Sequence, residues 1–190
     1  MIKIIFSIFK IFFLVFLFSP LILLFILIYF VLLFSNNGNP LFWSKRIGLN
    51  NQTFLMPKFR SMKINTPHVA SHLLQNSNNY ITKMGKILRK TSLDEIPQIF
   101  SILKGDMSLV GPRPALYNQI DLIKLRSSKN IHTLKPGLTG LAQINGRDDL
   151  SIEKKVEFDL IYLKNKSFFY DIKIIIKTFF KVLNIKDISH

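Results

Sequence analysis

The chain has 190 residues, enough for one modest domain with an accessory segment. Its formal net charge of +15 requires an anionic partner, which could be nucleic acid, acidic lipid or a phosphorylated substrate. Because 48% of the residues are hydrophobic and 18 are Phe, the composition favours a membrane surface over nucleic acid. The absence of cysteine excludes disulfides, zinc–thiolate sites and cysteine nucleophiles.

The first element is an uncharged hydrophobic segment over residues 11–34, long enough to cross a bilayer as one helix. Within it, Pro20 removes a backbone hydrogen bond and bends a helix, and the Ser19 hydroxyl can bond a carbonyl that the bend releases. Basic residues flank both ends of the segment: Lys3, Lys10, Lys45 and Arg46. The positive-inside rule then places both ends in the cytoplasm, as in a helix that enters the membrane, bends and returns. The residues alone leave this re-entrant hairpin and a single transmembrane helix both open.

Residues 41–62 predict short extended segments on either side of a turn at residues 48–51. Lys58 and Arg60 are two positions apart on the second segment, and side chains at this spacing point to the same side of a strand. A short helix is expected over residues 80–89.

Two adjacent carboxylates, Asp94 and Glu95, follow this helix. Apolar residues at helical spacing predict a further helix over residues 93–103, which Gly105 ends. Ser92 and Glu95 have the spacing of a capping box at its N-terminus. The pair is either a helix-stabilising feature or a nucleophile beside a metal ligand, and the residues alone do not decide between them.

The next segments are loops that carry single arginines. In the first loop, Pro112 and Pro114 fix the backbone on both sides of Arg113, which suits bidentate phosphate binding but also fits a stiff surface loop. Glycine-rich turns follow at residues 135–140 and 143–147, and the second ends in Arg147, another candidate phosphate ligand.

Helices are predicted over residues 117–126, over residues 151–163 with Ser151 as the cap, and over residues 168–183. The last of these carries a broad Phe and Ile stripe, with lysines recurring every fourth residue on another face. This pattern is typical of a helix lying in the lipid interface, although a helix that faces a protein core has the same periodicity.

The motifs occur in the order found in one family. They are SP at 19–20, RIG at 46–48, KFRSM at 58–62, RKTSLDEIPQ at 89–98, KGDMS at 104–108, GPRP at 111–114, PGLTG at 136–140 and QINGR at 143–147. With these motifs, nearly the whole chain resembles the small bacterial sugar transferases, the monotopic phosphoglycosyl transferases that act on polyprenyl phosphate. The family usually has Arg where Lys135 stands, and a lysine there loses the bidentate geometry.

The resemblance implies a mainly α fold with short β segments, in a monotopic membrane protein with interfacial amphipathic helices. Residues 1–36 would form a re-entrant helical hairpin, in which Ser19 and Pro20 have a structural role. Residues 37–190 would form a catalytic domain on the cytoplasmic face of the bacterial inner membrane.

The resemblance also implies the chemistry. Asp94 would attack the β-phosphorus of a UDP-sugar, expel UMP and hold the phosphosugar until polyprenyl phosphate accepts it, as the first membrane step of glycoconjugate synthesis. Glu95, with Asp94, would hold Mg²⁺. The substrate-binding residues would be Arg89, Arg113, Arg147, Lys58 and Arg60.

A rival interpretation is a non-catalytic membrane adaptor that recruits anionic partners through a basic surface. It explains the charge and the hydrophobicity, but not an acidic pair between cationic residues or two arginine-bearing loops. The expected partners are therefore a UDP-sugar, polyprenyl phosphate and anionic membrane lipids. Nucleic acid is not expected, because the chain has no basic–aromatic platform and no recognition-helix pattern.

Overall fold

The computed structural model describes residues 20, 22–35, 38–67, 79–146 and 149–183. The chain divides into two compact units, Met1–Pro40 and Leu41–His190. In the first unit, residues 22–34 are helical, and the turn at Ser35 closes on the carbonyl of Leu32. Pro20 is helical and exposed, whereas Ser19 lies outside the described residues. The predicted re-entrant helical hairpin is therefore not tested. Over the described part of the chain, every helix is too short or too polar to cross a membrane.

The second unit begins with a β-hairpin. Strand β1 (Leu41–Ile47) pairs antiparallel with β2 (Thr53–Phe59), in the register that places Phe42 opposite Lys58. The 3-10 turn η1 (Leu49–Asn51) connects them, with positive φ at Asn50 and Asn51. The prediction of extended segments around this turn is confirmed.

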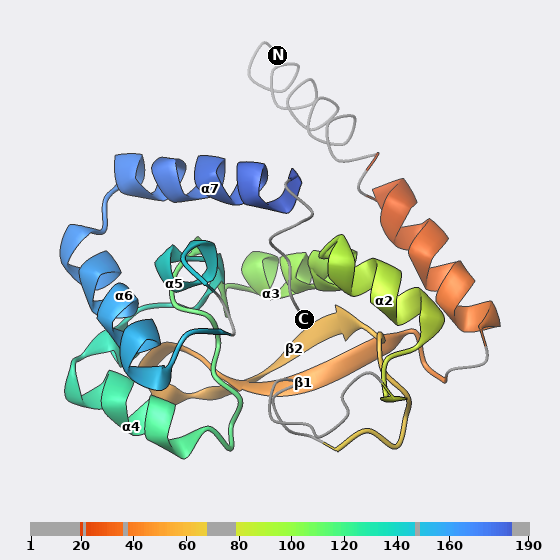
Figure 1. Ribbon diagram of the computed structural model, residues 1–190, viewed down its shortest axis with the longest axis horizontal. Helices are drawn as coiled ribbons and strands as arrows, with labels where there is room; N and C mark the ends of the chain where they lie inside the picture. Colours follow the sequence, from red (N-terminus) through yellow and green to blue (C-terminus); the bar gives the residue numbers. More distant parts are fainter. Residues whose placement is uncertain (1–19, 21, 36–37, 68–78, 147–148, 184–190) are drawn as a thin grey trace, which may run out of the picture. The chain divides into compact units, whose positions relative to one another are not determined.

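Helices α2 (Lys83–Lys90) and α3 (Ile99–Lys104) lie along one side of this hairpin (Figure 1). Between them is η4 (Leu93–Gln98), a 3-10 helix that packs against β2. Gly105 ends α3 in the left-handed conformation with φ of 90°, as predicted.

The predicted capping box is wrong. Ser92 has a left-handed backbone with φ of 56°, and its side chain forms no cap bond. The predicted single helix is divided between η4 and α3. Pro97 lies inside η4 and has no N–H to donate, so a regular α-helix cannot run through this segment with all its bonds made.

The remaining elements pack around one hydrophobic core. They are β3 (Ser108–Val110), α4 (Ile120–Ser128), η5 (Ile131–Thr133), β4 (Gly137–Thr139), α5 (Leu141–Ile144), α6 (Ile152–Asn165) and α7 (Phe168–Leu183). The core consists of Val110, Ala115, Leu122, Ile131, Leu134, Val156, Tyr162 and Ile174. Strands β3 and β4 are parallel. The described fold is mainly helical with short strands, as expected.

Two helix starts test the sequence patterns. The Ser151 hydroxyl accepts a hydrogen bond from the backbone of Lys154, so the predicted cap of α6 is confirmed. Helix α4 begins three residues later than predicted. Its delay has a local cause, because Leu116 forms an isolated β-bridge with Arg46 and its N–H donates to the Gln119 side chain.

The glycines of the PGLTG turn and the GPRP loop serve close contact between backbones. The N–H of Gly111 donates to Thr139 and that of Gly137 donates to Pro112, both at 2.9 Å. A Cβ atom added at Gly137 would overlap the backbone nitrogen of Gly111, and one at Gly140 would overlap the Gly111 carbonyl. These glycines therefore have a packing role, because a side chain at either position would meet backbone.

Gly137→Ala should lower the free energy of unfolding by about 3 kcal/mol, because the clash is with backbone that cannot rotate away. Gly48→Ala is the matched control, since its Cβ would meet the movable ring of Phe54 at 3.1 Å. Chemical denaturation of the two variants measures the difference. Equal stability of both variants would contradict the packing role.

Helix α7 exposes most of its apolar stripe. Phe168 and Phe169 are 74% and 81% exposed, and Phe179 and Phe180 are 62% and 65% exposed. Of the side chains described on this helix, only Ile174 belongs to the core. Helix α7 therefore faces the core through Ile174, with Tyr170 packed beside it, and leaves the rest of its described apolar stripe exposed.

Candidate active site

A cavity of about 430 Å³ opens between the hairpin, η4, the GPRP loop and helices α4 to α6. Its lining is strongly cationic, with eight basic and two acidic side chains. The basic ones are Arg46, Lys58, Arg60, Lys63, Arg89, Arg113, Arg126 and Lys155. The acidic ones are Asp94 and Glu95. A cavity of this size and charge is suited to bind an anionic small molecule.

The structure brings together the predicted site residues that it describes. Lys58, Arg60, Arg89 and Arg113 come from segments far apart in the sequence and line the same cavity as the acidic pair. Arg147 lies outside the described residues.

The acidic pair lies in the first turn of η4, and each carboxylate-bearing residue is only 9% exposed. The left-handed backbone of Ser92 starts this turn, and the N–H of Glu95 donates to the Ser92 carbonyl. Because η4 packs against β2, the pair faces the cations of the hairpin.

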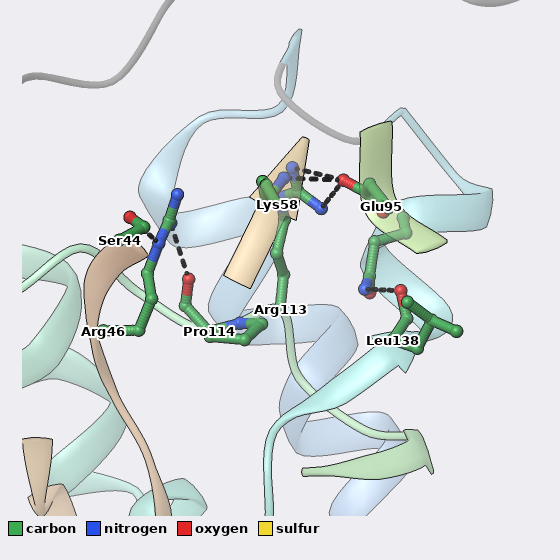
Figure 2. A network of polar contacts seen from close by, with 8 residues as sticks. Ser44, Arg46, Lys58, Glu95, Arg113, Pro114 and Leu138 are labelled. Carbon is green, nitrogen blue, oxygen red and sulfur yellow. Dashed lines mark hydrogen bonds and ion pairs between the residues drawn. The ribbon is translucent and has the colours of Figure 1, made fainter. Parts of the chain in front are cut away.

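Glu95 binds two cations through one carboxylate oxygen. Its Oε1 accepts a bond of 2.9 Å from Lys58 Nζ and two bonds of 3.3 Å from the Arg113 guanidinium. Figure 2 shows Lys58 and Arg113 converging on this atom, while Arg46 turns toward Ser44 and the Pro114 carbonyl. Glu95 therefore joins β2 to the GPRP loop in the lining of the cavity.

The charge of Lys58 depends on its neighbours. Burial lowers the pKa of its ammonium from the ordinary 10.5, and the Arg113 guanidinium adds to this effect. The carboxylates of Glu95 and Asp94 oppose it. Removing Glu95 would therefore leave a buried ammonium without the carboxylate that most favours its charged form.

Arg60 lies beside the aromatic part of the lining. Its guanidinium carbon is 5.7 Å from the centre of the Phe42 ring, and Nη2 donates to the Leu41 carbonyl at 3.5 Å. These contacts hold Arg60 against β1, with Met62 and Ile64 continuing the same wall of the cavity.

A magnesium ion fits the acidic pair in part. Two adjacent carboxylates are a usual protein contribution to a Mg²⁺ site, whose other ligands are substrate oxygens and water. Within the described ranges, no three His, Cys, Asp or Glu side chains gather closely enough to hold a metal by themselves. A metal at Glu95 would share this carboxylate with Lys58 and Arg113, which both bond Oε1.

Sequence reasoning missed several cavity residues. Arg46 carried a signal, because it belongs to the RIG motif, and Gln143 belongs to the QINGR motif. Arg126 and Lys155 carried none, since each is one basic residue on an ordinary helical pattern. Their place in the cavity comes from the packing of α4 and α6.

The sequence is similar to those of known sugar transferases. The family model described as bacterial sugar transferase matches residues 1–185. The uncharacterized sugar transferase EpsL of Bacillus subtilis (strain 168) is 45% identical over 77% of this chain and 71% of its own length. The exopolysaccharide production protein ExoY of Rhizobium meliloti (strain 1021) is 39% identical over 85% of this chain and 76% of its own.

A third relative is longer. The UDP-glucose:undecaprenyl-phosphate glucose-1-phosphate transferase of Escherichia coli (strain K12) is 42% identical over 77% of this chain, which spans 33% of that protein. The family model covers almost the entire chain, and the resemblance inferred from the motifs is confirmed. The chain therefore belongs to the bacterial sugar transferase family and is an enzyme of the transferase class.

Proposed function

We propose that the chain transfers a phosphosugar from a UDP-sugar to polyprenyl phosphate, giving polyprenyl diphosphate-sugar and UMP. The observation that carries the proposal is the buried Asp94–Glu95 pair in the lining of a cavity that also carries eight cationic side chains. Two relatives support the substrate class, since one is an undecaprenyl-phosphate galactose phosphotransferase from Salmonella typhimurium and the other is named for UDP-glucose and undecaprenyl phosphate.

The proposed reaction has two displacements at the same phosphorus. A carboxylate oxygen of Asp94 attacks the β-phosphorus of the UDP-sugar, and the bond from that phosphorus to the bridging oxygen breaks as UMP leaves. A phosphate oxygen of polyprenyl phosphate then attacks the aspartyl phosphosugar, and the carboxylate of Asp94 is restored. Asp94 suits this role because a carboxylate forms an acyl phosphate that remains reactive enough to be discharged.

The cations bind and orient the anionic substrates. Lys58 and Arg113 stand directly beside the acidic pair, so they are placed to contact the diphosphate while Glu95 holds them in position. Arg89 and Arg60 extend the positive lining on either side. Without this charge, two polyanionic substrates would repel the carboxylates that they must approach.

Mg²⁺ belongs to the proposal as a bound cofactor. Glu95 and Asp94 would hold it, and when bound it would supply charge compensation for the diphosphate. The cationic side chains of the cavity would still bind and orient the diphosphate.

The described helices support a place at the membrane. Helix α7 presents an exposed apolar stripe together with exposed Lys173 and Lys177, a combination that suits acyl chains below and anionic lipid headgroups beside it. We propose that residues 1–36 enter and leave the bacterial inner membrane on its cytoplasmic face, with the catalytic unit lying on the same interface. The reaction would then be the first membrane step of glycoconjugate synthesis.

The adaptor alternative gains no support from the site. A recruiting surface needs exposed charge, whereas Asp94, Glu95 and Lys58 are largely buried inside a cavity of substrate size. Burying charged groups costs free energy that a flat docking surface does not require.

UMP release by the full-length chain in detergent, measured with a panel of UDP-sugars and polyprenyl phosphate, tests the proposal. We expect release with at least one sugar, and loss of release in excess chelator followed by recovery with Mg²⁺. Full activity in chelator would contradict the metal assignment. No release with any UDP-sugar, from folded protein with Mg²⁺ present, would contradict the function.

A further inference from the structure

The GPRP loop is anchored through its carbonyl groups. Pro112 and Pro114 have no N–H, so this loop offers few backbone donors to its neighbours. Four consecutive carbonyls, those of Pro112, Arg113, Pro114 and Ala115, each accept a hydrogen bond. The donors, in the same order, are Gly137 N at 2.9 Å, Arg126 Nη1 at 2.8 Å, Arg46 Nη1 at 3.0 Å and Ile47 N at 2.9 Å.

Arg126 is held by a buried carboxylate. Its Nε and Nη2 donate to Asp159 Oδ2 at 2.9 and 2.7 Å, while Nη1 donates to the Arg113 carbonyl. The side chains of Arg126 and Asp159 are 11% and 2% exposed. Burial raises the pKa of Asp159, and the Arg126 guanidinium opposes that rise. All three guanidinium nitrogens of Arg126 therefore already donate to protein acceptors.

The cationic cavity thus contains basic residues of two kinds. Lys58 and Arg113 point at the acidic pair, whereas Arg126 points at the backbone of the residue that it supports. We infer that Arg126, oriented by Asp159, is a positioning residue that fixes the Arg113 guanidinium at the reacting diphosphate and does not itself bind phosphate. The inference rests on the proposed function for the role of Arg113, but the anchoring itself does not.

The geometry explains why an arginine is needed. A guanidinium can bond a carboxylate with one edge and a carbonyl with another, because its donors form a planar fork. A lysine offers one nitrogen on a flexible stem and cannot serve both acceptors with the same directions. Displacement of a binding group by about 1 Å can cost about a hundredfold in rate.

A double-mutant cycle between Arg126 and Arg113 tests the inference. Arg126→Lys keeps the positive charge, yet we expect it to lower kcat/KM for UMP release by about 10- to 100-fold. In an Arg113→Ala background, the same change should lower kcat/KM by less than about twofold, because the group that Arg126 positions is gone. Equal losses in both backgrounds would mean that Arg126 acts on substrate directly, and would overturn the inference.

Two comparisons separate positioning from loss of fold. Lys124→Met replaces an exposed cation on the same helix and should leave kcat/KM unchanged. If Arg126→Lys unfolds, Arg126→Met combined with Asp159→Leu removes both buried charges at similar volume, which such pairs often tolerate. This pair should retain the unfolding midpoint and still lose the same 10- to 100-fold in kcat/KM.

A readout without activity completes the test. In the Arg126→Lys variant, hydrogen exchange should quicken at the amides of Gly137 and Ile47, which donate to the Pro112 and Ala115 carbonyls of the loop, while exchange within α4 stays unchanged. Unchanged exchange at these amides would overturn the anchoring whether or not the wild type releases UMP. Failure of the wild type to release UMP, with faster loop exchange in the variant, would instead contradict the proposed function alone.

Discussion

Asp94→Asn should lower the rate of UMP release by at least about a thousandfold, because the amide cannot form the covalent bond to the β-phosphorus. The side chain keeps its size, and the residue lies in a short 3-10 turn that does not depend on a cap from it. Expression and membrane association should therefore match the wild type. Release of UMP at a near-normal rate would exclude Asp94 as the nucleophile.

The covalent intermediate gives this prediction a second measurement. Incubation with a UDP-sugar that carries radioactive sugar, without polyprenyl phosphate, should label the wild-type chain and leave the Asn variant unlabelled. Asp121→Asn is the matched control, since Asp121 is an exposed carboxylate in the first turn of α4, away from the cavity lining. Labelling of the Asp94→Asn variant would place the nucleophile elsewhere.

The sequence predicted the parts of this fold that depend on local pattern. The hairpin, the cap at Ser151, the end of α3 at Gly105 and the amphipathic character of α7 all follow from spacing and residue type. Such features need only neighbours within a few residues, so periodicity and turn chemistry are enough to find them.

The capping box failed because distant partners compete for its residues. Glu95 has the right spacing to reach back to Ser92, but its carboxylate bonds Lys58 and Arg113, which are 37 and 18 positions away. An ion pair in a poorly solvated cavity is stronger than a local bond to an N–H at a helix end. The departure from local preference thus falls at the candidate site itself.

The anchoring of the GPRP loop could not have been predicted. Arg126 and Asp159 are 33 positions apart, and each is one charged residue in a helix whose other face carries the core. Their pairing depends on how α4 packs against α6, which no local pattern specifies. The two side chains become buried only when the unit folds.

Cysteines placed at Lys3 and at Lys45 should both be shielded from an impermeant thiol reagent added to intact cells. The chain has no cysteine of its own, so each introduced thiol is the only labelling site. Both should label once the cells are permeabilised, which shows that the thiols are reactive. Labelling of the Lys3 site in intact cells would establish a true span of the membrane and contradict the re-entrant proposal.

The expected shielding follows from charge and from the Ser19–Pro20 break. A straight helix over residues 11–34 would measure roughly 36 Å, so length alone permits a crossing of the bilayer. The break leaves about 8 apolar residues before it and about 14 after it, each too few to span. Basic residues on both flanks favour the cytoplasm at both ends, and the exposed stripe of α7 favours the same interface for the catalytic unit.

Replacing Ser19 and Pro20 by two leucines should convert this segment to a spanning helix. Leucine restores the backbone donor that Pro20 lacks and removes the hydroxyl that would serve a carbonyl at the bend. The thiol at position 3 should then label in intact cells, while the thiol at position 45 stays shielded. Continued shielding of both sites would show that flanking charge, and not the Ser19–Pro20 break, determines the topology.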